Sequence, residues 1–237
     1  MKISIIIPTF QESQIIVQTI LKIDSFLSKY SIDAEIIIVD DNSPDQTSTI
    51  AKQAKTQASL IIISHLGKRS LSNSALQGFT AASTDIIILM DADLSHPLDA
   101  IPQMIALLEN EADIVVGSRY IKGGNSSEWN IFRRLLSSFA RITTYGITTL
   151  TDPTSGFVAF KKNILNGCVL KPIGWKIVLE LVVKSNAKVK EIPITFIERK
   201  EGKSKLSVLI HLQFIIHLIQ LHYYVWSRRL VKLIKGQ

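Results

Sequence analysis

The 237-residue sequence contains a single cysteine, Cys168, so no disulfide bond can form within the chain. The first apolar run, residues 3–7, ends at Pro8 and is too short for the hydrophobic core of a secretory signal peptide. Charged residues make up 20% of the sequence and hydrophobic residues 46%, which excludes a disordered or fibrous chain. These features predict a packed cytosolic protein with room for one large domain and a tail.

Acidic residues are absent after Glu201, whereas six basic residues follow it: Lys203, Lys205, Arg228, Arg229, Lys232 and Lys235. The basic and aromatic residues do not form an interleaved nucleic-acid-binding motif, and the stretch between the basic residues is strongly apolar. We therefore expect this end of the chain to contact an anionic membrane surface on the cytoplasmic side, and we expect no nucleic-acid partner.

Two common nucleotide-binding motifs are also missing. The sequence has neither the glycine-rich dinucleotide pattern nor the P-loop pattern. Their absence argues against an enzyme that uses a nicotinamide cofactor and against a P-loop kinase.

Five short runs rich in isoleucine and valine predict buried strands, at residues 3–7, 35–39, 60–63, 86–90 and 114–116. Segments with helical spacing lie among them, at residues 16–27, 46–57, 71–82 and 97–108. This alternation predicts an α/β fold with a mostly parallel central sheet that is flanked by helices on both faces.

In such sheets, ligands bind beyond the carboxyl ends of the strands. Acidic residues follow three predicted strands: Glu12 the first, Asp40 and Asp41 the second, and Asp91 and Asp93 the fourth. Carboxylates that lie together repel one another and raise one another's pKa unless a cation is present. We therefore expect Asp91 and Asp93 to hold one hard divalent cation, Mg²⁺ or Mn²⁺, with positions left for diphosphate oxygens and water.

Other interpretations exist for single residues of this set. An isolated D-x-D pair is a weak signal. Polar residues after a strand often cap the next helix, and we expect Asp41 to have this role in part. His96 precedes a proline at a predicted helix start, a position typical of local structure. Glu180 lies alone in an apolar run, and a buried carboxylate needs a partner, so it is a candidate for orienting a basic residue of the site.

Six stretches, taken in order, resemble the family 2 glycosyltransferases, which have the GT-A fold, and within them the dolichyl- or polyprenyl-phosphate mannosyltransferases. They are SIIIPTFQE (4–12), EIIIVDDNSPDQT (35–47), DIIILMDADLSHP (85–97), DIVVGSRY (113–120), TDPTSGF (151–157) and EIPITFIERKEGKSKL (191–206). The Q-x-x-R-W motif of processive polysaccharide synthases is absent, which argues against cellulose or chitin synthesis. The resemblance predicts a catalytic domain over residues 1–205 and a membrane-associating helical tail over residues 206–237.

The resemblance implies a nucleotide-sugar site at the strand ends. Pro8, Phe10, Glu12 and Asp40 fall where family members hold the nucleoside, with Asp40 near the base, Glu12 near the ribose and Phe10 packed against the nucleoside. Ala92 is counted with these nucleotide-binding residues.

The resemblance also implies a metal and diphosphate position at Asp91 and Asp93. Ser95 occupies a third position that is glutamine in some relatives. Because a serine hydroxyl is a shorter and weaker ligand, its share in metal binding is less than that of the two carboxylates.

Basic residues complete the predicted catalytic set. Arg119, Arg133 or Arg134, and Lys205 match positions that in the family contact phosphate groups of the donor or the acceptor. A guanidinium can grip two phosphate oxygens, whereas a lysine supplies a point charge suited to a loop that closes on the donor. The alternative for Arg133 and Arg134 is an ordinary solvated helix face.

The resemblance implies transfer of a hexose, with inversion, from a nucleotide sugar to a polyprenyl phosphate. GDP-mannose is the expected donor, and UDP-glucose is the alternative. A phosphatase of the haloacid dehalogenase type is disfavoured because its D-x-D motif normally lies near the start of its domain. A non-catalytic subunit that binds nucleotide sugars would be expected to have lost acidic or basic site residues, and this chain has not.

The apolar stretch 206–226 is expected to lie in the membrane interface. Polar residues interrupt it, whereas a spanning helix needs ~20 mostly apolar residues. Tyr223, Tyr224 and Trp226 lie next to Arg228 and Arg229, a composition typical of a membrane boundary. The alternative is a helix that packs on protein or forms a dimer. Because many relatives carry further membrane helices, we expect this chain to rely on a partner membrane protein.

Overall fold

A computed structural model describes residues 2–65, 67, 69–125, 138–197 and 208–234. Its centre is a seven-stranded sheet in the order β3-β2-β1-β4-β6-β5-β7. The five strands predicted from the sequence are present as β1 (Ile3–Thr9), β2 (Ala34–Asp40), β3 (Ser59–Ser64), β4 (Ile86–Leu89) and β5 (Ile114–Ser118). The predicted α/β fold with a mostly parallel sheet is confirmed.

The parallel pairing of four strands explains why these strands are largely apolar. β1 pairs in parallel with β2 and with β4, and β2 pairs in parallel with β3. Every residue of β1, β2 and β4 is buried, because helices cover both faces of the sheet. β3 lies at the edge and is less buried.

Two further strands were not predicted from the sequence. β6 (Val158–Lys161) is antiparallel to both of its neighbours, β4 and β5. β7 (Val189–Pro193) pairs in parallel with β5. β6 (VAFK) contains alanine and ends in a lysine, and β7 carries Lys190 and Glu191 at an edge, so neither shows the run rich in isoleucine and valine that marks the predicted strands.

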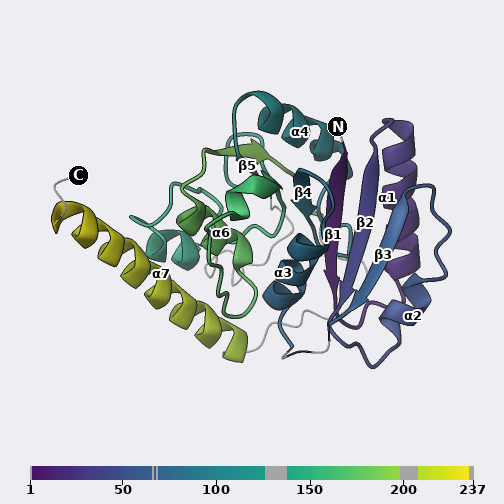
Figure 1. Cartoon of the computed structure of the whole chain (residues 1–237), viewed down its shortest axis with the longest axis horizontal. Coiled ribbons are helices and arrows are strands. Elements are labelled where there is room, and N and C mark those ends of the chain that lie inside the picture. The colour runs from purple at the N-terminus through teal and green to yellow at the C-terminus, as the bar shows by residue number, and fades with distance from the viewer. Residues whose placement is uncertain (1, 66, 68, 126–137, 198–207, 235–237) are drawn as a thin grey trace.

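Helices cover the two faces of the sheet (Figure 1). One core contains residues of α1 (Ile16–Lys29), α2 (Thr47–Ala51) and α4 (Ile101–Asn110), and α4 follows a short 3-10 turn, η1 (Leu98–Ala100). The other core contains residues of α3 (Leu71–Ala81) and α6 (Ile177–Ser185). A second 3-10 turn, η2 (Lys162–Leu165), follows β6. The helix predicted over residues 46–57 is shorter than expected and ends at Ala51.

The long helix α7 (Val208–Ile234) lies beside α6, away from β1, β2 and β3 (Figure 1). Leu218 and Leu221 of α7 are buried in a small apolar cluster with Leu179 of α6. Among the described residues, no helix combines the length and hydropathy that crossing a membrane requires. The predicted division between residues 205 and 206 falls outside the described residues and stays a prediction.

Candidate active site

The carboxyl ends of three adjacent strands meet at one edge of the sheet. β1 lies between β2 and β4, and Thr9 at the end of β1 pairs with Asp40 at the end of β2. The D-x-D segment begins directly after β4, at Asp91. The chain therefore brings the predicted nucleoside residues and the predicted metal residues to the same edge.

Asp40 organises the loop after β2. Its oxygens accept hydrogen bonds from Thr9 Oγ1 (3.2 Å), from Ser43 N (3.1 Å) and from Ser43 Oγ (2.5 Å), and the residue is buried. Ser43 Oγ in turn accepts a bond from Gln11 N (2.9 Å), which ties the loops after β1 and β2 together. The predicted contact of Asp40 with the base stays a prediction, but its carboxylate already has protein donors.

Asp41 offers a less satisfied carboxylate at the same place. The residue is buried, and its Oδ1 has no hydrogen-bond partner in the described part of the chain. Burial raises the pKa of Asp41, although a hydrogen bond from the Ser70 backbone and the charges of His65 and Arg69 lower it. A buried acceptor without a donor is costly unless a ligand supplies one. Helix capping, the role predicted in part for Asp41, does not account for this unpartnered oxygen.

Phe10 and Arg69 form a stacked pair close to these acids. The Arg69 guanidinium lies 4.5 Å from the centroid of the Phe10 ring. An arginine over an aromatic face is a favourable arrangement, and both groups are planar. Phe10 was predicted to pack against the nucleoside, whereas Arg69 was not predicted.

The remaining predicted nucleoside residues lie at the same edge. Pro8 is a buried residue of β1, opposite Val39 of β2. The backbone N–H of Glu12 donates to Thr47 Oγ1 (3.0 Å), so Glu12 is held at the start of α2. The carbonyl of Ala92 accepts a hydrogen bond from Thr19 Oγ1 of α1 (2.6 Å) and thereby fixes the D-x-D segment to the fold.

The two aspartates of that segment differ in their surroundings. Asp91 has a half-exposed side chain, and its Oδ2 lies 3.9 Å from His96 Nε2. Asp93 Oδ1 accepts a hydrogen bond from Ser95 N (3.0 Å), and Leu94 between them has a positive φ of 56°. The Oγ of Ser95 is buried and has no hydrogen-bond partner among the described residues.

Asp91, Asp93 and Ser95 supply some of the oxygen ligands that a hard divalent cation needs. Two carboxylates and one unpartnered hydroxyl are oxygen donors of the kind that Mg²⁺ and Mn²⁺ prefer. A Cβ added at Gly156 would lie 3.6 Å from Asp91 Oδ1, so the glycine keeps space open beside that carboxylate. The described residues contain no group of three His, Cys, Asp or Glu side chains that could hold a metal. Further ligands would therefore come from the diphosphate and water.

His96 has a structural position behind Asp91. Its ring is buried and stacks on Phe157 with centroids 5.0 Å apart, and its Nδ1 accepts a hydrogen bond from Asp91 N (3.2 Å). Burial lowers the pKa of His96 despite the nearby charges of Asp91 and Asp93, which raise it. This geometry agrees with the local structural role expected for His96.

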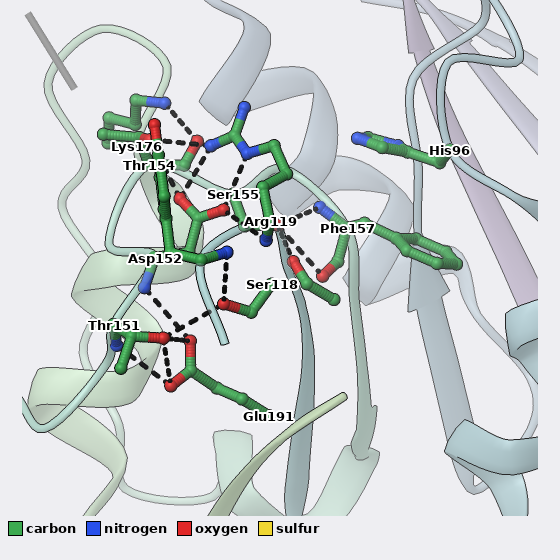
Figure 2. A network of polar contacts seen from close by, with 12 residues as sticks. His96, Ser118, Arg119, Thr151, Asp152, Thr154, Ser155, Phe157, Lys176 and Glu191 are labelled. Carbon is green, nitrogen blue, oxygen red and sulfur yellow. Dashed lines mark hydrogen bonds and ion pairs between the residues drawn. The ribbon is translucent and has the colours of Figure 1, made fainter. Parts of the chain in front are cut away.

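Arg119, directly after β5, is paired with an acidic residue that the sequence analysis did not single out (Figure 2). Its Nε and Nη2 donate to the two carboxylate oxygens of Asp152, at 2.7 and 2.6 Å, and its backbone N–H also donates to Asp152 (3.1 Å). Nη2 also donates to Thr154 Oγ1 (2.8 Å). Both residues of the pair are buried. The guanidinium fork predicted to grip phosphate thus grips Asp152, and its contact with phosphate stays a prediction.

A second set of hydrogen bonds holds Asp152 itself in place (Figure 2). Glu191 of β7 accepts hydrogen bonds from the backbone N–H groups of Thr151 (2.9 Å) and Asp152 (3.0 Å). The hydroxyl of Thr151 also donates to Glu191 and lies 3.0 Å from Ser118 Oγ. The polar residues of the unpredicted strand β7 therefore position the acid that orients Arg119.

The chain matches the family model described as glycosyl transferase family 2 over residues 4–168. The chain belongs to glycosyl transferase family 2. It is 37% identical to a dolichol-phosphate mannosyltransferase of Pyrococcus furiosus, over 99% of this chain and 67% of that relative. It is 33% identical to a dolichol-phosphate mannosyltransferase of Saccharomyces cerevisiae, over 92% of this chain and 86% of that relative. The prediction of a family 2 glycosyltransferase is confirmed.

Solved structures support the fold of this family 2 glycosyltransferase. The chain resembles glucosyl-3-phosphoglycerate synthase from Mycobacterium tuberculosis, in complex with Mn²⁺, UDP-glucose and phosphoglyceric acid, with a TM-score of 0.66. The two are 17% identical, over 92% of this chain and 79% of that chain. At this identity the likeness shows the fold alone, and the predicted GT-A fold is confirmed.

Four residues considered for the site in the sequence are not among the described residues assembled at these strand ends. Arg133, Arg134 and Lys205 lie outside the described residues. Glu180 is buried on α6, and its oxygens contact Lys184 Nζ and, at 2.8 Å, Lys171 N.

Glu180 therefore has a different task from the predicted one. His217 Nε2 of α7 lies 3.3 Å from Glu180 Oε2, and both side chains are buried. Burial alone would raise the pKa of Glu180, but contacts with His217, Lys184 and Lys171 lower it further than burial raises it. The expectation that Glu180 orients a basic site residue is wrong, because its partners in the described chain are Lys171, Lys184 and His217, none of which is a predicted site residue. The contact with His217 connects α6 with α7.

Proposed function

We propose that this glycosyltransferase transfers mannose from GDP-mannose to a polyprenyl phosphate, with a divalent cation bound at Asp91 and Asp93. One observation carries the proposal: the unpartnered carboxylate oxygen of Asp41 and the Asp91–Asp93 pair lie at adjacent ends of β2, β1 and β4. A nucleoside diphosphate bound along this edge has its base at one end and its diphosphate at the other. The relatives named dolichol-phosphate mannosyltransferase support the same sugar and acceptor.

The chemistry of Asp41 favours guanine over uracil. A carboxylate can accept hydrogen bonds from both the ring N1–H and the exocyclic amino group of guanine, whereas uracil presents one ring N–H. Arg69 and Phe10 supply flat groups for the remainder of the nucleoside. The expected donor is therefore GDP-mannose, and UDP-glucose is the competing donor that an assay must include.

The bound cation would neutralise charge on the diphosphate as it leaves. Asp91, Asp93 and the hydroxyl of Ser95 are the residues that would hold it. Behind Asp91, the ring of His96 fixes the backbone of the segment, so the two carboxylates are oriented before the donor arrives.

The acceptor needs no protein base. A phosphate monoester has its second pKa near ~6 and is largely dianionic at neutral pH. Its oxygen attacks the anomeric carbon while the bond from that carbon to the diphosphate oxygen breaks, which inverts the configuration. The task of the protein is to align these groups, and the ion pair with Asp152 holds the Arg119 guanidinium at a fixed point.

A polyprenyl acceptor requires contact with a membrane, and α7 offers a suitable face. Exposed apolar residues three or four positions apart lie along one side of the helix: Leu212, Ile215, Ile219, Tyr223 and Trp226. His217, Leu218 and Leu221 are buried against the protein on another side. Arg228 and Arg229 follow the apolar stripe. We infer that α7 lies in the interface on the cytoplasmic side of the membrane.

Turnover with defined donors tests the function, and Asp41→Asn tests the choice of base. The purified chain with Mg²⁺ or Mn²⁺ should transfer sugar to polyprenyl phosphate from GDP-mannose faster than from UDP-glucose.

The substitution Asp41→Asn keeps the shape of the side chain but presents an N–H group to the base. The kcat/KM for GDP-mannose should therefore fall roughly 5- to 100-fold, as for loss of a paired base contact. Asp33→Asn, at the other end of β2, should leave kcat/KM unchanged. Preference for UDP-glucose in the unchanged protein would overturn the assignment of the base.

Membrane binding should depend on the apolar stripe of α7. Ile219→Glu places a charge on that stripe, and burial of an isoleucine is worth about 1.5–3 kcal/mol, so vesicle affinity should fall roughly 10- to 100-fold. Gln220→Glu changes the charge by the same amount at the next, polar position. The measurement is co-flotation with vesicles that contain anionic lipid. Equal loss in both variants would argue that charge alone, and not the stripe, is responsible.

A further inference from the structure

Lys176 has an ammonium group buried beside the site. The residue immediately precedes α6 and is 4% exposed. Its Nζ donates to the carbonyl oxygen of Thr154 (2.5 Å) and lies 3.4 Å from the centroid of the Trp175 ring. A carbonyl and an aromatic face carry only partial negative charge. Within the described ranges, no carboxylate lies within ion-pair distance of this ammonium.

The acid nearest to Lys176 in the network is already engaged. Asp152 forms a two-point contact with Arg119, whose Nη2 also donates to Thr154 Oγ1. Two positively charged groups therefore meet at Thr154, one on its hydroxyl and one on its carbonyl, and Figure 2 shows both beside Asp152. One carboxylate cannot neutralise both charges.

The surroundings of Lys176 disfavour its charge in the absence of an anion. Burial and, to a smaller extent, the charge of Arg119 lower the pKa of Lys176 to about 7, although the charges of Asp152 and Asp91 raise it. The residue also precedes the first turn of the nine-residue helix α6, where backbone N–H groups attract negative charge and disfavour a cation. The described surroundings of Lys176 therefore supply no full negative charge to offset that of its ammonium group.

We propose that Lys176 binds a phosphate group of a substrate, at a position between Asp91 and the Arg119–Asp152 pair. The bound phosphate supplies the negative charge that the protein lacks there, and the start of α6 favours the same anion. The group is either the diphosphate of the donor or the phosphate of the acceptor, and this deepening of the proposed function identifies Lys176 as a residue that touches substrate.

Calorimetry with three probes separates the two sources of phosphate. The probes are GDP with Mg²⁺, inorganic pyrophosphate with Mg²⁺, and a short water-soluble prenyl phosphate. Lys176→Gln keeps a donor for the Thr154 carbonyl and removes the charge, and Lys176→Met is a second variant that removes both. Lys190→Met is the charge-matched control, because it removes a lysine of β7 from an exposed ion pair with Glu111, which follows α4.

Loss of the ammonium should weaken binding roughly 10- to 100-fold, either of the two donor probes or of the prenyl phosphate, which is the range for a hydrogen bond to a charged group. Loss for GDP and pyrophosphate assigns Lys176 to the donor, and loss for the prenyl phosphate assigns it to the acceptor. Both variants should also melt at the wild-type temperature or above at pH 6, because they remove a buried charge without an acidic partner. A purely structural lysine would give lower melting temperatures and unchanged affinities.

All three affinities within twofold of wild type, in a variant that folds, would overturn the proposal. The pyrophosphate and prenyl phosphate titrations involve no sugar and no transfer. Weaker binding in the Lys176 variants would therefore stand even if the unchanged protein failed to transfer mannose.

Discussion

Replacing Asp91 by asparagine should lower kcat roughly 10²- to 10³-fold, the range found when one group that stabilises developing charge is removed. Asparagine has nearly the same shape, but it lacks the charge that holds a divalent cation against the diphosphate. The carboxylate is half-exposed and contacts only His96 among the described residues, so the fold should tolerate the change. The measurement is steady-state turnover at saturating donor and acceptor, with the melting temperature recorded in parallel.

Asp99→Asn is the matched control for this prediction. Asp99 lies in the short 3-10 turn before α4, eight residues after Asp91. The substitution Asp99→Asn therefore removes the same charge from the same segment of the chain. It should retain wild-type turnover. If Asp91→Asn and Asp99→Asn had similar activity, the cation would not be bound by the D-x-D segment.

Replacing Asp152 by asparagine should destabilise the fold by about 3–5 kcal/mol, the usual effect of leaving one partner of a buried ion pair without its counter-charge. Arg119 would remain buried against a neutral amide. Unfolding in urea gives the free energy. The exposed pair Lys190–Glu111 provides the comparison, because Glu111→Gln should change that free energy by less than about 1 kcal/mol.

The Asp152 pair also predicts how stability depends on pH. Desolvation raises the pKa of Asp152, but the hydrogen bonds and charge of Arg119 lower it further, so the folded-state pKa lies below the ordinary value. A carboxyl with a lowered pKa stabilises the fold above its unfolded pKa of about 3.9, and that stability is lost as pH falls through the folded pKa. The difference between wild type and Asp152→Asn should therefore shrink in strongly acidic solution. A difference that stayed constant to pH 2 would contradict the role of this pair.

The central strands could be predicted because a parallel strand buried on both faces is rich in apolar residues along most of its length. The runs at residues 3–7 and 86–90 are of this kind, and they correspond to β1 and β4. β7 has no such signal, because Lys190 and Glu191 lie in an edge strand. Glu191 nevertheless matters for the site, since it holds the loop that carries Asp152.

The acidic strand ends were predictable as a group, but the task of each acid was not. Asp40 and Asp41 are neighbours in sequence, and motif reading favoured Asp40 for the base. The structure gives Asp40 three protein donors and leaves Asp41 Oδ1 without one. Which of the two adjacent carboxylates receives hydrogen bonds from the protein depends on where Thr9, at the end of β1, and Ser43, after β2, lie in the folded chain. Sequence spacing does not determine those positions.

The cations of the site were harder still to predict. Arg119 was recognised from its motif, but its partner Asp152 is 33 positions away in a loop. Lys176 has no distinctive sequence context, and its importance comes from burial and from the missing acid. Both features require the packing of α6 against the sheet, which a linear pattern does not contain.

The acids at adjacent strand ends are proposed to hold the donor's diphosphate through a divalent cation. The decisive measurement is a calorimetric titration of GDP-mannose into the protein, with Mn²⁺ and with a chelator. We expect binding with Mn²⁺, at least tenfold weaker binding with the chelator, and the same weakening in Asp91→Asn with Mn²⁺ present. Equal affinity in all three titrations would show that no cation at these acids holds the donor.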